Sequence, residues 1–418
     1  MVDSDKDGKA DAIDSCRYVY AKTPDGCPVK RVITGVNIYL ETSASMGGYY
    51  LKNAEFKNII SDLAIKVDKN IKPVQIYFLA DSPVRYKNSV EKFSTDIAIT
   101  RPAVSRSSQL HKFLSSIAAN TDSSHVSFLV SDCILSFPDA AIKANPEINR
   151  DAAPGALKNN IFSTFAELKK RGQAVSIFAF TSKFYGTYYD YRNVKTKLNG
   201  TPRPFYIWVI GHRDVLKDFE KQLTDISSFQ PLQALHFGLL DSTVNRFDLF
   251  YSAGKHGSWK KDGVDSILKD VEIPSKDSLR FAVAVDLSTL PGYVQQTSYF
   301  NKNVQLTLKG CSAAVKIVKK EDFDRSKIAG DQQMSVIERA SHVLLFSVGS
   351  QTLSNARITL SLPLQYDSWY QSWSIDDDRF LDPHNPQTFA FKYLIEGVKE
   401  AYETRNKNYL EFSIQLNK

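Results

Sequence analysis

Short apolar runs and amphipathic stretches alternate along residues 31–240 of the chain. Five runs rich in β-branched and aromatic residues predict buried strands at residues 36–40, 74–79, 126–130, 174–180 and 205–210. Between these runs, apolar residues recur with the period of a helix at residues 53–67, 109–119, 155–172 and 214–226. Strands that alternate with helices in this way are typical of a mostly parallel sheet covered on both faces. Residues 31–240 are therefore predicted to form an α/β domain.

Beyond residue 240 the pattern changes to short β-type runs separated by Gly, Ser, Asn and Pro. The runs lie at residues 279–287, 304–308, 315–318, 342–348, 356–362 and 409–416. One amphipathic helix is predicted at residues 388–402, with its apolar side chains directed toward a core. Residues 241–418 are therefore predicted to form a β-rich, sandwich-like domain with one C-terminal helix.

The composition is that of an ordinary globular protein. The 418 residues are 43% hydrophobic and 24% charged, which suggests two to three domains. The net charge of +7 is spread over 53 basic and 46 acidic residues without a basic stripe, so we do not expect nucleic-acid binding. No apolar run approaches the roughly 20 residues that a membrane span requires.

The predicted strand at residues 36–40 ends in a group of oxygen-bearing side chains. Glu41, Ser43 and Ser45 alternate with other residues, and Gly47 and Gly48 follow before the next helix. Ligands of open α/β sheets bind at the carboxyl ends of strands. Three hard oxygens at this spacing can converge on a small hard cation such as Mg²⁺. The alternative is that Ser43 and Ser45 only cap the following helix.

This segment, Glu41-x-Ser43-x-Ser45-Met46-Gly47, resembles the D-x-S-x-S-M-G motif that opens the metal-ion-dependent adhesion site of von Willebrand factor A domains. The resemblance covers roughly residues 33–240 and implies a Rossmann-like fold. Glu41 stands where the family has Asp, and its extra methylene moves the carboxylate outward by about 1.5 Å.

The same resemblance implies two further ligand positions on later loops. They are Ser107 or Ser108 on a second loop and Asp132 on a third. It also implies that Mg²⁺ or Mn²⁺ occupies the site and that an acidic side chain of a protein ligand completes its coordination. The alternative role for Asp132 is a helix cap without an ion.

A second candidate cation site lies near the amino terminus. Carboxylates occupy loop positions one, three, five, nine and twelve, Gly8 occupies position six, and Lys9 offers its carbonyl at position seven. The carboxylates are those of Asp3, Asp5, Asp7, Asp11 and Asp14. With Cys16, Cys27 and the Pro that follows, the stretch resembles a thrombospondin type 3 repeat. That resemblance implies bound Ca²⁺ and a Cys16–Cys27 disulfide; the alternative is an acidic leader without a fixed structure.

The amino terminus also bears on the compartment. Met1 is followed directly by polar and charged residues, without an apolar signal segment. Either the sequence lacks its original beginning, or the protein is not exported. Disulfides persist outside the cytosol, so we expect an extracytoplasmic protein, whether secreted, periplasmic or on the cell surface, whose signal segment is absent from this sequence.

Three groups of residues have two interpretations each. The tyrosines at positions 185, 188, 189 and 191 either cover an insertion against the sheet or present a binding face. Trp369 and Trp373, with the acidic residues 376–378, form either a core group beside a solvated turn or a glycan or cation site. Cys133 and Cys311 are either free buried thiols, the interpretation we favour, or an interdomain bridge.

The leading hypothesis is a metal-dependent protein-binding or adhesion protein. The second is a structural component of the cell envelope or of an assembly, in which the A-like fold serves as a metal-free scaffold. A metal-dependent hydrolase is the third, and we do not expect enzyme activity because the seven histidines show neither metal-ligand nor triad spacing.

Overall fold

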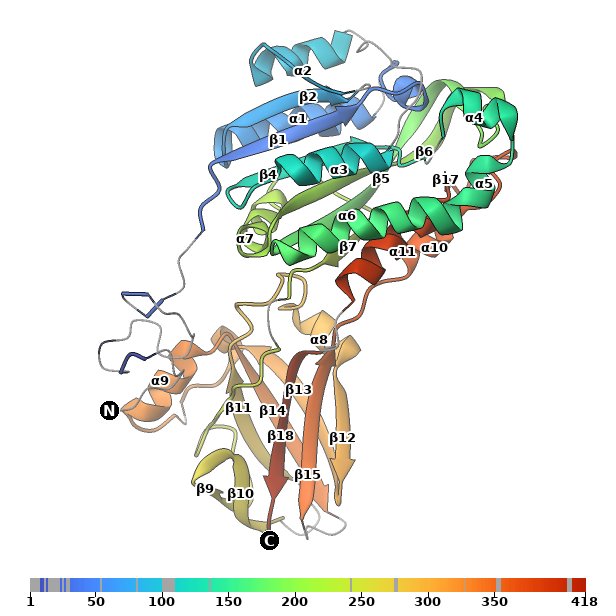
Figure 1. Ribbon diagram of the computed structural model, residues 1–418. Coiled ribbons are helices and arrows are strands. Elements are labelled where there is room, and N and C mark those ends of the chain that lie inside the picture. The colour runs from blue at the N-terminus through green and yellow to red at the C-terminus, as the bar shows by residue number, and fades with distance from the viewer. Residues whose placement is uncertain are drawn as a thin grey trace.

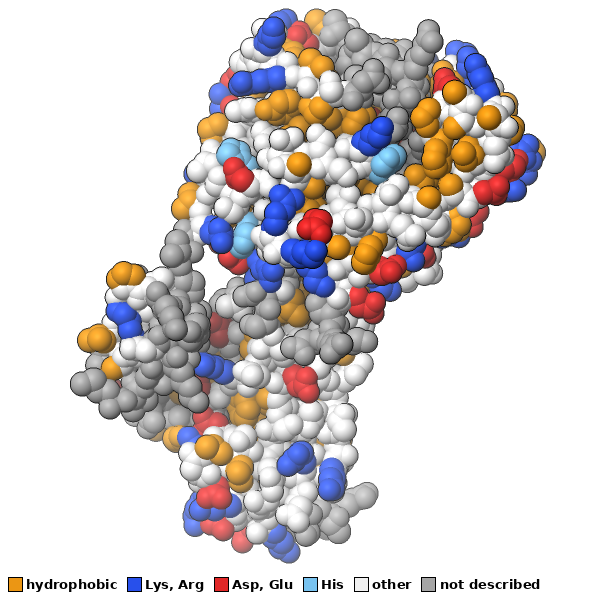
Figure 2. All heavy atoms as spheres, viewed as in Figure 1, with side chains coloured by type: hydrophobic (Ala, Val, Ile, Leu, Met, Phe, Trp, Pro, Cys, Tyr) orange, Lys and Arg blue, Asp and Glu red, His pale blue; other side chains and the backbone are white. Residues whose placement is uncertain are grey.

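The chain forms an α/β region and a β-rich region, one above the other in Figure 1. The computed structural model describes residues 8–10, 13, 23–24, 26–27, 31–52, 55–79, 82–99, 110–134, 137–240, 243–273, 277–326, 328–350, 355–403 and 408–418. None of the helices in these ranges is long and apolar enough to cross a membrane. Basic and acidic side chains are interspersed over the face shown in Figure 2.

A seven-stranded sheet forms the centre of the α/β region, with strand order β3-β2-β1-β4-β6-β5-β7. Its strands are β1 (Gly35–Glu41), β2 (Val74–Leu79), β3 (Pro83–Arg85), β4 (His125–Ser131), β5 (Gln173–Tyr189), β6 (Lys195–His212) and β7 (Gln233–Phe237). Strand β1 pairs parallel with β2 and with β4. The other four pairings are antiparallel. The sheet is therefore mixed, and the prediction of a mostly parallel sheet was wrong.

Helices cover both faces of this sheet, as the apolar strands predicted. One face carries α1 (Glu55–Asn70), α2 (Val90–Ile99) and α7 (Arg213–Leu223), which bury side chains in one core cluster with β1, β4 and β6. The other face carries α3 (Leu110–Asn120) and α6 (Lys158–Lys170), which share a second cluster with the same strands. Three short helical elements, α4 (Asp139–Ala144), α5 (Ile148–Ala152) and η2 (Ala153–Leu157), precede α6.

The antiparallel pairing arises from one long hairpin. Strands β5 and β6 pair from Gln173 and His212 to Tyr189 and Lys195, so residues 181–204 continue both strands and are not a separate insertion. The turn closes where Asp190 Oδ1 accepts hydrogen bonds from the backbone N–H groups of Arg192 and Val194, both at 2.9 Å. Such a side-chain-to-backbone turn allows two strands to pair directly, without the helical crossover that parallel strands require.

The β-rich region contains two sheets that share one core. A five-stranded sheet has the order β12-β15-β18-β10-β9, and a four-stranded sheet has the order β13-β14-β11-β8. The strands are β8 (Asp248–Leu249), β9 (Ser258–Asp262), β10 (Val264–Glu272), β11 (Leu279–Val285), β12 (Gln305–Lys309), β13 (Cys311–Lys319), β14 (His342–Ser350), β15 (Ala356–Pro363) and β18 (Asn408–Leu416). Buried side chains from both sheets, such as Phe281 and Phe412, belong to a single cluster. The region also contains α8 (Thr297–Asn303), η3 (Lys320–Asp322) and α9 (Asp331–Arg339).

Residues 364–403, which we call the returning segment, leave the β-rich region after β15 and pack on the α/β region (Figure 1). The segment contains α10 (Trp369–Ser372), β16 (Ser374–Ile375), β17 (Thr388–Phe389) and α11 (Phe391–Tyr402). Its aromatic side chains bury into the sheet: Phe391 stacks on Tyr206 with ring centroids 4.0 Å apart. Gly397 allows α11 to approach α6 closely, because a Cβ there would lie 2.7 Å from the carbonyl oxygen of Lys158. The helix predicted at residues 388–402 thus exists, and it packs on the α/β sheet.

Candidate metal site at the carboxyl ends of β1 and β4

The predicted site residues Glu41 and Asp132 lie side by side at one edge of the sheet. Strands β1 and β4 run parallel, with Leu40 opposite Val130. Glu41 is the last residue of β1, and Asp132 follows directly after β4. Carboxyl ends of adjacent parallel strands meet at the same edge, which is where ligands of open α/β sheets bind.

Buried contacts hold the loop after β1 in place. The hydroxyl of Tyr50 donates to the backbone oxygen of Glu41 at 2.9 Å, and the backbone N–H of Asp132 contacts Met46 Sδ at 3.2 Å. The loop runs through η1 (Ser45–Gly48). Gly48 is required there, because a Cβ would lie 2.4 Å from the ring of Phe184. The Met46-Gly47-Gly48 sequence therefore allows the loop to pack tightly against β5.

Three of the oxygen-bearing side chains are almost completely buried. Glu41 is 1% exposed, and Ser43 and Asp132 are each 2% exposed. The hydroxyls of Ser43 and Ser45 lie 2.9 Å apart and share a hydrogen bond. Asp132 Oδ1 accepts a hydrogen bond from the backbone N–H of Ile134 at 3.1 Å. Asp132 Oδ2 is buried and has no hydrogen-bond partner among the described residues.

The electrostatics of the site are those of two like charges held together. Burial, and next the negative charge of Glu41, raise the pKa of Asp132 to about 7. Hydrogen bonds from Ile134 and Ser45, together with the charge of Arg203, act in the opposite direction on this pKa. Burial and the same two carboxylates raise the pKa of the Tyr50 hydroxyl. A buried pair of carboxylates must share either a proton or a cation.

The capping alternatives do not describe these residues. Neither serine caps a helix: η1 follows Ala44 without a side-chain cap, and α1 begins only at Glu55. After Asp132 the next helix, α4, begins at Asp139, so Asp132 forms a local turn with Ile134. Ser107 and Ser108, the predicted ligands from the second loop, lie outside the described residues.

Among the described residues, no group of three or more His, Cys, Asp or Glu side chains could hold a metal ion. The predicted site supplies two carboxylates, and its remaining oxygens belong to hydroxyl groups. Of the oxygen-bearing side chains of the β1 loop, Glu41, Thr42 and Ser43 are buried and Ser45 is half-buried.

Most of the predicted calcium loop lies outside the described residues, namely Asp3, Asp5, Asp7, Asp11, Asp14 and Cys16. Gly8, at position six of the predicted loop, has a φ of 101°, a backbone conformation that favours glycine. The ammonium group of Lys9 donates to the carbonyl oxygen of Pro24. Cys27 forms a disulfide bond, whereas Cys133 and Cys311 are free thiols, as we favoured.

A further buried carboxylate, that of Asp378, was not predicted. Asp378, from the returning segment, is 1% exposed, although the acidic turn at residues 376–378 was interpreted as solvated. Its Oδ2 accepts from the hydroxyl of Tyr188, and its Oδ1 accepts from the backbone N–H of Tyr191 at 3.0 Å. Burial raises the pKa of Asp378 to about 6, against these hydrogen bonds. Tyr188 and Tyr191 therefore pack against the protein and do not present a binding face, since each is at most 2% exposed.

One Ser–His–acid group occurs elsewhere on the sheet, where Ser176, Glu220 and His236 meet. Ser176 Oγ lies 2.8 Å from His236 Nδ1, and Glu220 Oε2 lies 3.1 Å from the same nitrogen. A catalytic triad uses opposite ring nitrogens for the serine and the acid. Ser176 is also 0% exposed. The geometry of this group is therefore structural.

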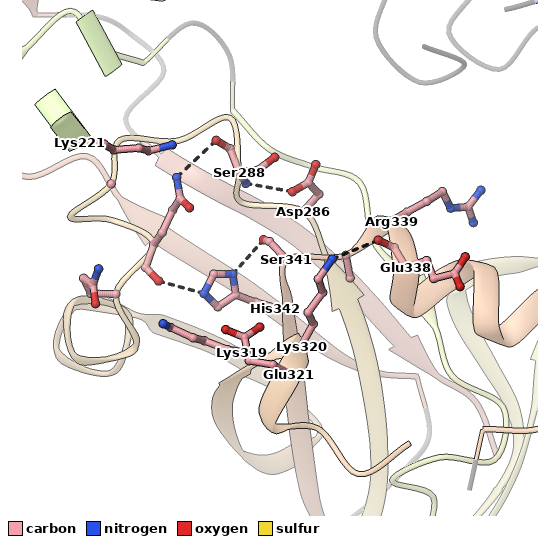
Figure 3. Close-up of a pocket in the computed structure, with 14 residues that line it drawn as sticks. Lys221, Asp286, Ser288, Lys319, Lys320, Glu321, Glu338, Arg339, Ser341 and His342 are labelled. Atoms are coloured by element: carbon pink, nitrogen blue, oxygen red, sulfur yellow. Dashed lines mark hydrogen bonds between the residues drawn. The ribbon is translucent and has the colours of Figure 1, made fainter. Parts of the chain in front are cut away.

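A cavity of about 500 Å³ lies between α7 and the loops of the β-rich region (Figure 3). Basic and acidic side chains line it, including Lys221, Lys319 and Glu321. Both ring nitrogens of His342 are engaged, with Ser341 Oγ and with the carbonyl oxygen of Gln295, each at 2.9 Å. The cavity shares no residue with the Glu41–Asp132 pair.

Comparison with known proteins leaves the family of the chain open. The von Willebrand factor A and thrombospondin type 3 features remain resemblances of short motifs. No protein-family model, no curated protein and no solved structure matches this chain.

Proposed function

We propose that this chain is an extracytoplasmic protein-binding protein that grips its ligand through a divalent cation. Glu41, Ser43, Ser45 and Asp132 would hold the ion, with Ser107 or Ser108 from the second loop. An acidic side chain of the protein ligand would complete the coordination, as in the adhesion site that the motif resembles. The observation that carries the proposal is the buried Asp132 Oδ2, which has no hydrogen-bond partner among the described residues and lies beside a second buried carboxylate.

A cation resolves the physical difficulty of this arrangement. Burying two carboxylates side by side is strongly unfavourable unless a positive charge or a proton lies between them. Carboxylate and hydroxyl oxygens are the ligands that Mg²⁺ and Mn²⁺ prefer, and Mg²⁺ commonly binds through one or two carboxylates. The residues present therefore fit a small divalent cation, which would supply positive charge for a ligand carboxylate.

The amino-terminal segment supports the extracytoplasmic part of the proposal. Cys27 forms a disulfide bond, and disulfides persist outside reducing compartments. The predicted loop at residues 3–14 would bind Ca²⁺ through its five carboxylates and the carbonyl of Lys9. Its role would be structural, because it stands apart in the sequence from the Glu41–Asp132 pair.

Calorimetric titration of Mn²⁺ and Mg²⁺ into the full chain tests the metal site. With the amino-terminal loop saturated by Ca²⁺, we expect saturable Mn²⁺ or Mg²⁺ binding that Asp132→Asn abolishes, because the variant removes one of two charged ligands without changing side-chain volume. Asp377→Asn is the matched control, since Asp377 is a partly exposed carboxylate paired with Arg379. Unchanged binding in Asp132→Asn, or no binding by the unmodified chain, would contradict the proposal.

A metal-free scaffold is the second candidate function, and one observation favours it. A pKa of about 7 lets Asp132 keep a proton close to neutral pH, so the carboxyl pair could be stable as a proton-sharing pair. The protein would then bind partners through surfaces that do not depend on a cation. Pull-down of a protein complex that survives chelation supports this alternative, whereas dissociation on chelation supports the metal-dependent one.

A further inference from the structure

Arg203 is buried, and its positive charge acts on Asp132. It lies on β6, which pairs antiparallel with β4 so that Tyr206 lies opposite Ser131. Continuing this register puts Asp132 opposite Phe205 and Arg203 two residues further on, about 7 Å along the strand. Side chains two residues apart lie on one face of a strand. Because Val130 and Phe205 enter the same core cluster, Asp132 and Arg203 share that face.

The guanidinium of Arg203 has few direct partners. Arg203 is 4% exposed, and its Nη2 donates to the hydroxyl of Tyr188 at 3.3 Å. The guanidinium also lies over the Tyr188 ring, 4.5 Å from its centroid. In the part of the chain that the structure describes, no salt bridge includes Arg203. A guanidinium carries five N–H donors, and among the described residues no carboxylate is in direct contact with this one.

Asp378 contacts the same tyrosine as Arg203. Its Oδ2 accepts from the Tyr188 hydroxyl, the same oxygen that receives the Arg203 hydrogen bond. The returning segment, anchored by α11 on α6, therefore contributes a carboxylate that faces Arg203 across Tyr188. The positive charge of Arg203 thus acts on both Asp378 and Asp132.

We infer that Arg203 is an internal counter-charge of the Glu41–Asp132 pair, held in position by Tyr188 and Asp378, and that it sets the affinity of the site for a divalent cation. The inference about affinity rests on the proposed function. Glu41 and Asp132 supply two negative charges, and Arg203 offsets one of them. The pair thus remains attractive to a divalent ion, while the nearby positive charge weakens the binding of that ion.

Arg203 and Asp378 are positioning residues in this scheme, and their removal has opposite effects. Without Arg203, the carboxylates attract a divalent cation more strongly. Without the charge of Asp378, the whole field of Arg203 acts on the Glu41–Asp132 pair, and the cation binds more weakly. If either residue were purely structural, the two substitutions would not change the cation affinity in opposite directions.

Mn²⁺ titration of full-chain variants tests the inference. We expect Arg203→Met to tighten Mn²⁺ binding on the order of tenfold and Asp378→Asn to weaken it. Arg203→Lys keeps the charge and should restore an affinity close to that of the unmodified chain. Asp377→Asn, which alters the neighbouring but partly exposed carboxylate, should change nothing. Unchanged or weaker Mn²⁺ binding by a folded Arg203→Met chain would overturn the inference.

A double-mutant cycle without metal separates this inference from the proposed function. Urea unfolding of Arg203→Met, Asp132→Asn and the double variant should show that Asp132→Asn relieves the destabilisation caused by Arg203→Met. The expected coupling is on the order of tenfold in the unfolding constant. Additive changes in the unfolding free energy would overturn the inference that Arg203 is a counter-charge of Asp132. Coupling in a chain that fails to bind Mn²⁺ would support the counter-charge and contradict the metal site.

Discussion

Asp132 and Asp378 are both buried aspartates, and their surroundings differ in one respect. They are 2% and 1% exposed, and burial raises their pKa values to about 7 and about 6, respectively. Both oxygens of Asp378 accept hydrogen bonds, from the Tyr188 hydroxyl and the Tyr191 backbone. Only Oδ1 of Asp132 accepts one from a described residue, whereas its Oδ2 does not.

The difference shows that burial alone does not mark a binding site. A buried carboxylate whose hydrogen-bonding capacity is filled by its own chain acts as an anchor. Asp378 fits that description, since it ties the returning segment to the β5–β6 hairpin. A buried carboxylate beside a second one, with one oxygen left over, has an incomplete environment that an ion or a proton can complete. Asp132 fits the second description.

The largest predicted effect tests the anchor. Asp378→Ala should destabilise the chain by about 3 kcal/mol, because it leaves the Tyr188 hydroxyl and the Tyr191 N–H without acceptors and removes a charge facing Arg203. Asp132→Ala in the absence of metal should cost less, because it removes one of two repelling carboxylates. Urea unfolding of both variants measures the difference. Equal destabilisation by the two variants would break the comparison.

Asp377→Ala is the control for the anchor. Its carboxylate is partly exposed and paired with Arg379, and exposed ion pairs contribute little to stability. We expect a change within about 0.5 kcal/mol. A loss as large as that for Asp378→Ala would mean that the turn as a whole, and not the buried carboxylate, anchors the segment.

The two aspartates should affect the pH dependence of the unfolding free energy over different pH ranges. A carboxyl with a raised pKa binds its proton more tightly in the folded chain, so its favourable contribution is complete below the unfolded value near 4. That contribution is lost as the pH rises through the folded pKa, about 6 for Asp378 and about 7 for Asp132. The slope for each group reaches at most about 1.4 kcal/mol per pH unit.

Urea unfolding between pH 4 and pH 8 measures these pH ranges. The free energy of unfolding of the metal-free chain is compared with that of each variant. Asp132→Asn should remove the part of the decline between about pH 6 and pH 7, and Asp378→Asn should leave that part unchanged. Saturating Mn²⁺ should act like Asp132→Asn, since the ion replaces the proton. An equal effect of Mn²⁺ on the pH dependence of stability in Asp132→Asn and Asp378→Asn would contradict the assignment of the ion to Asp132.

The sequence predicts those strands of both regions whose apolar runs are buried on both faces or alternate with period two, whereas β7, β8, β9 and β10 were not predicted. The runs at residues 36–40 and 126–130 correspond to β1 and β4, and their ends bring Glu41 and Asp132 to one edge. Parallel neighbours require only local patterns and a crossover helix, both of which are visible in the residues.

Long-range partners could not be predicted in this way. Direct pairing of β5 with β6 depends on a turn at Asp190 that local polarity does not distinguish from an insertion. Asp378 stands in an Asp-rich turn typical of solvated surface, and it is buried only because the returning segment packs on the α/β sheet. Arg203 gave no signal, since a lone arginine on a strand reveals its neighbours only when the register is known.

A smaller effect than that of Asp378→Ala is expected at Glu41, where the chain departs from the motif that it resembles. Glu41→Asp should cost about 1 kcal/mol in stability, because the loop is packed around the longer side chain and loses one buried methylene. The shorter carboxylate withdraws by about 1.5 Å, which is large compared with the roughly 2.1 Å coordination distance of Mg²⁺. We therefore expect Mn²⁺ affinity to fall on the order of tenfold, although the substitution restores the residue of the motif. Tighter Mn²⁺ binding by Glu41→Asp would contradict this expectation and show that the geometry of the site suits Asp better than Glu at position 41.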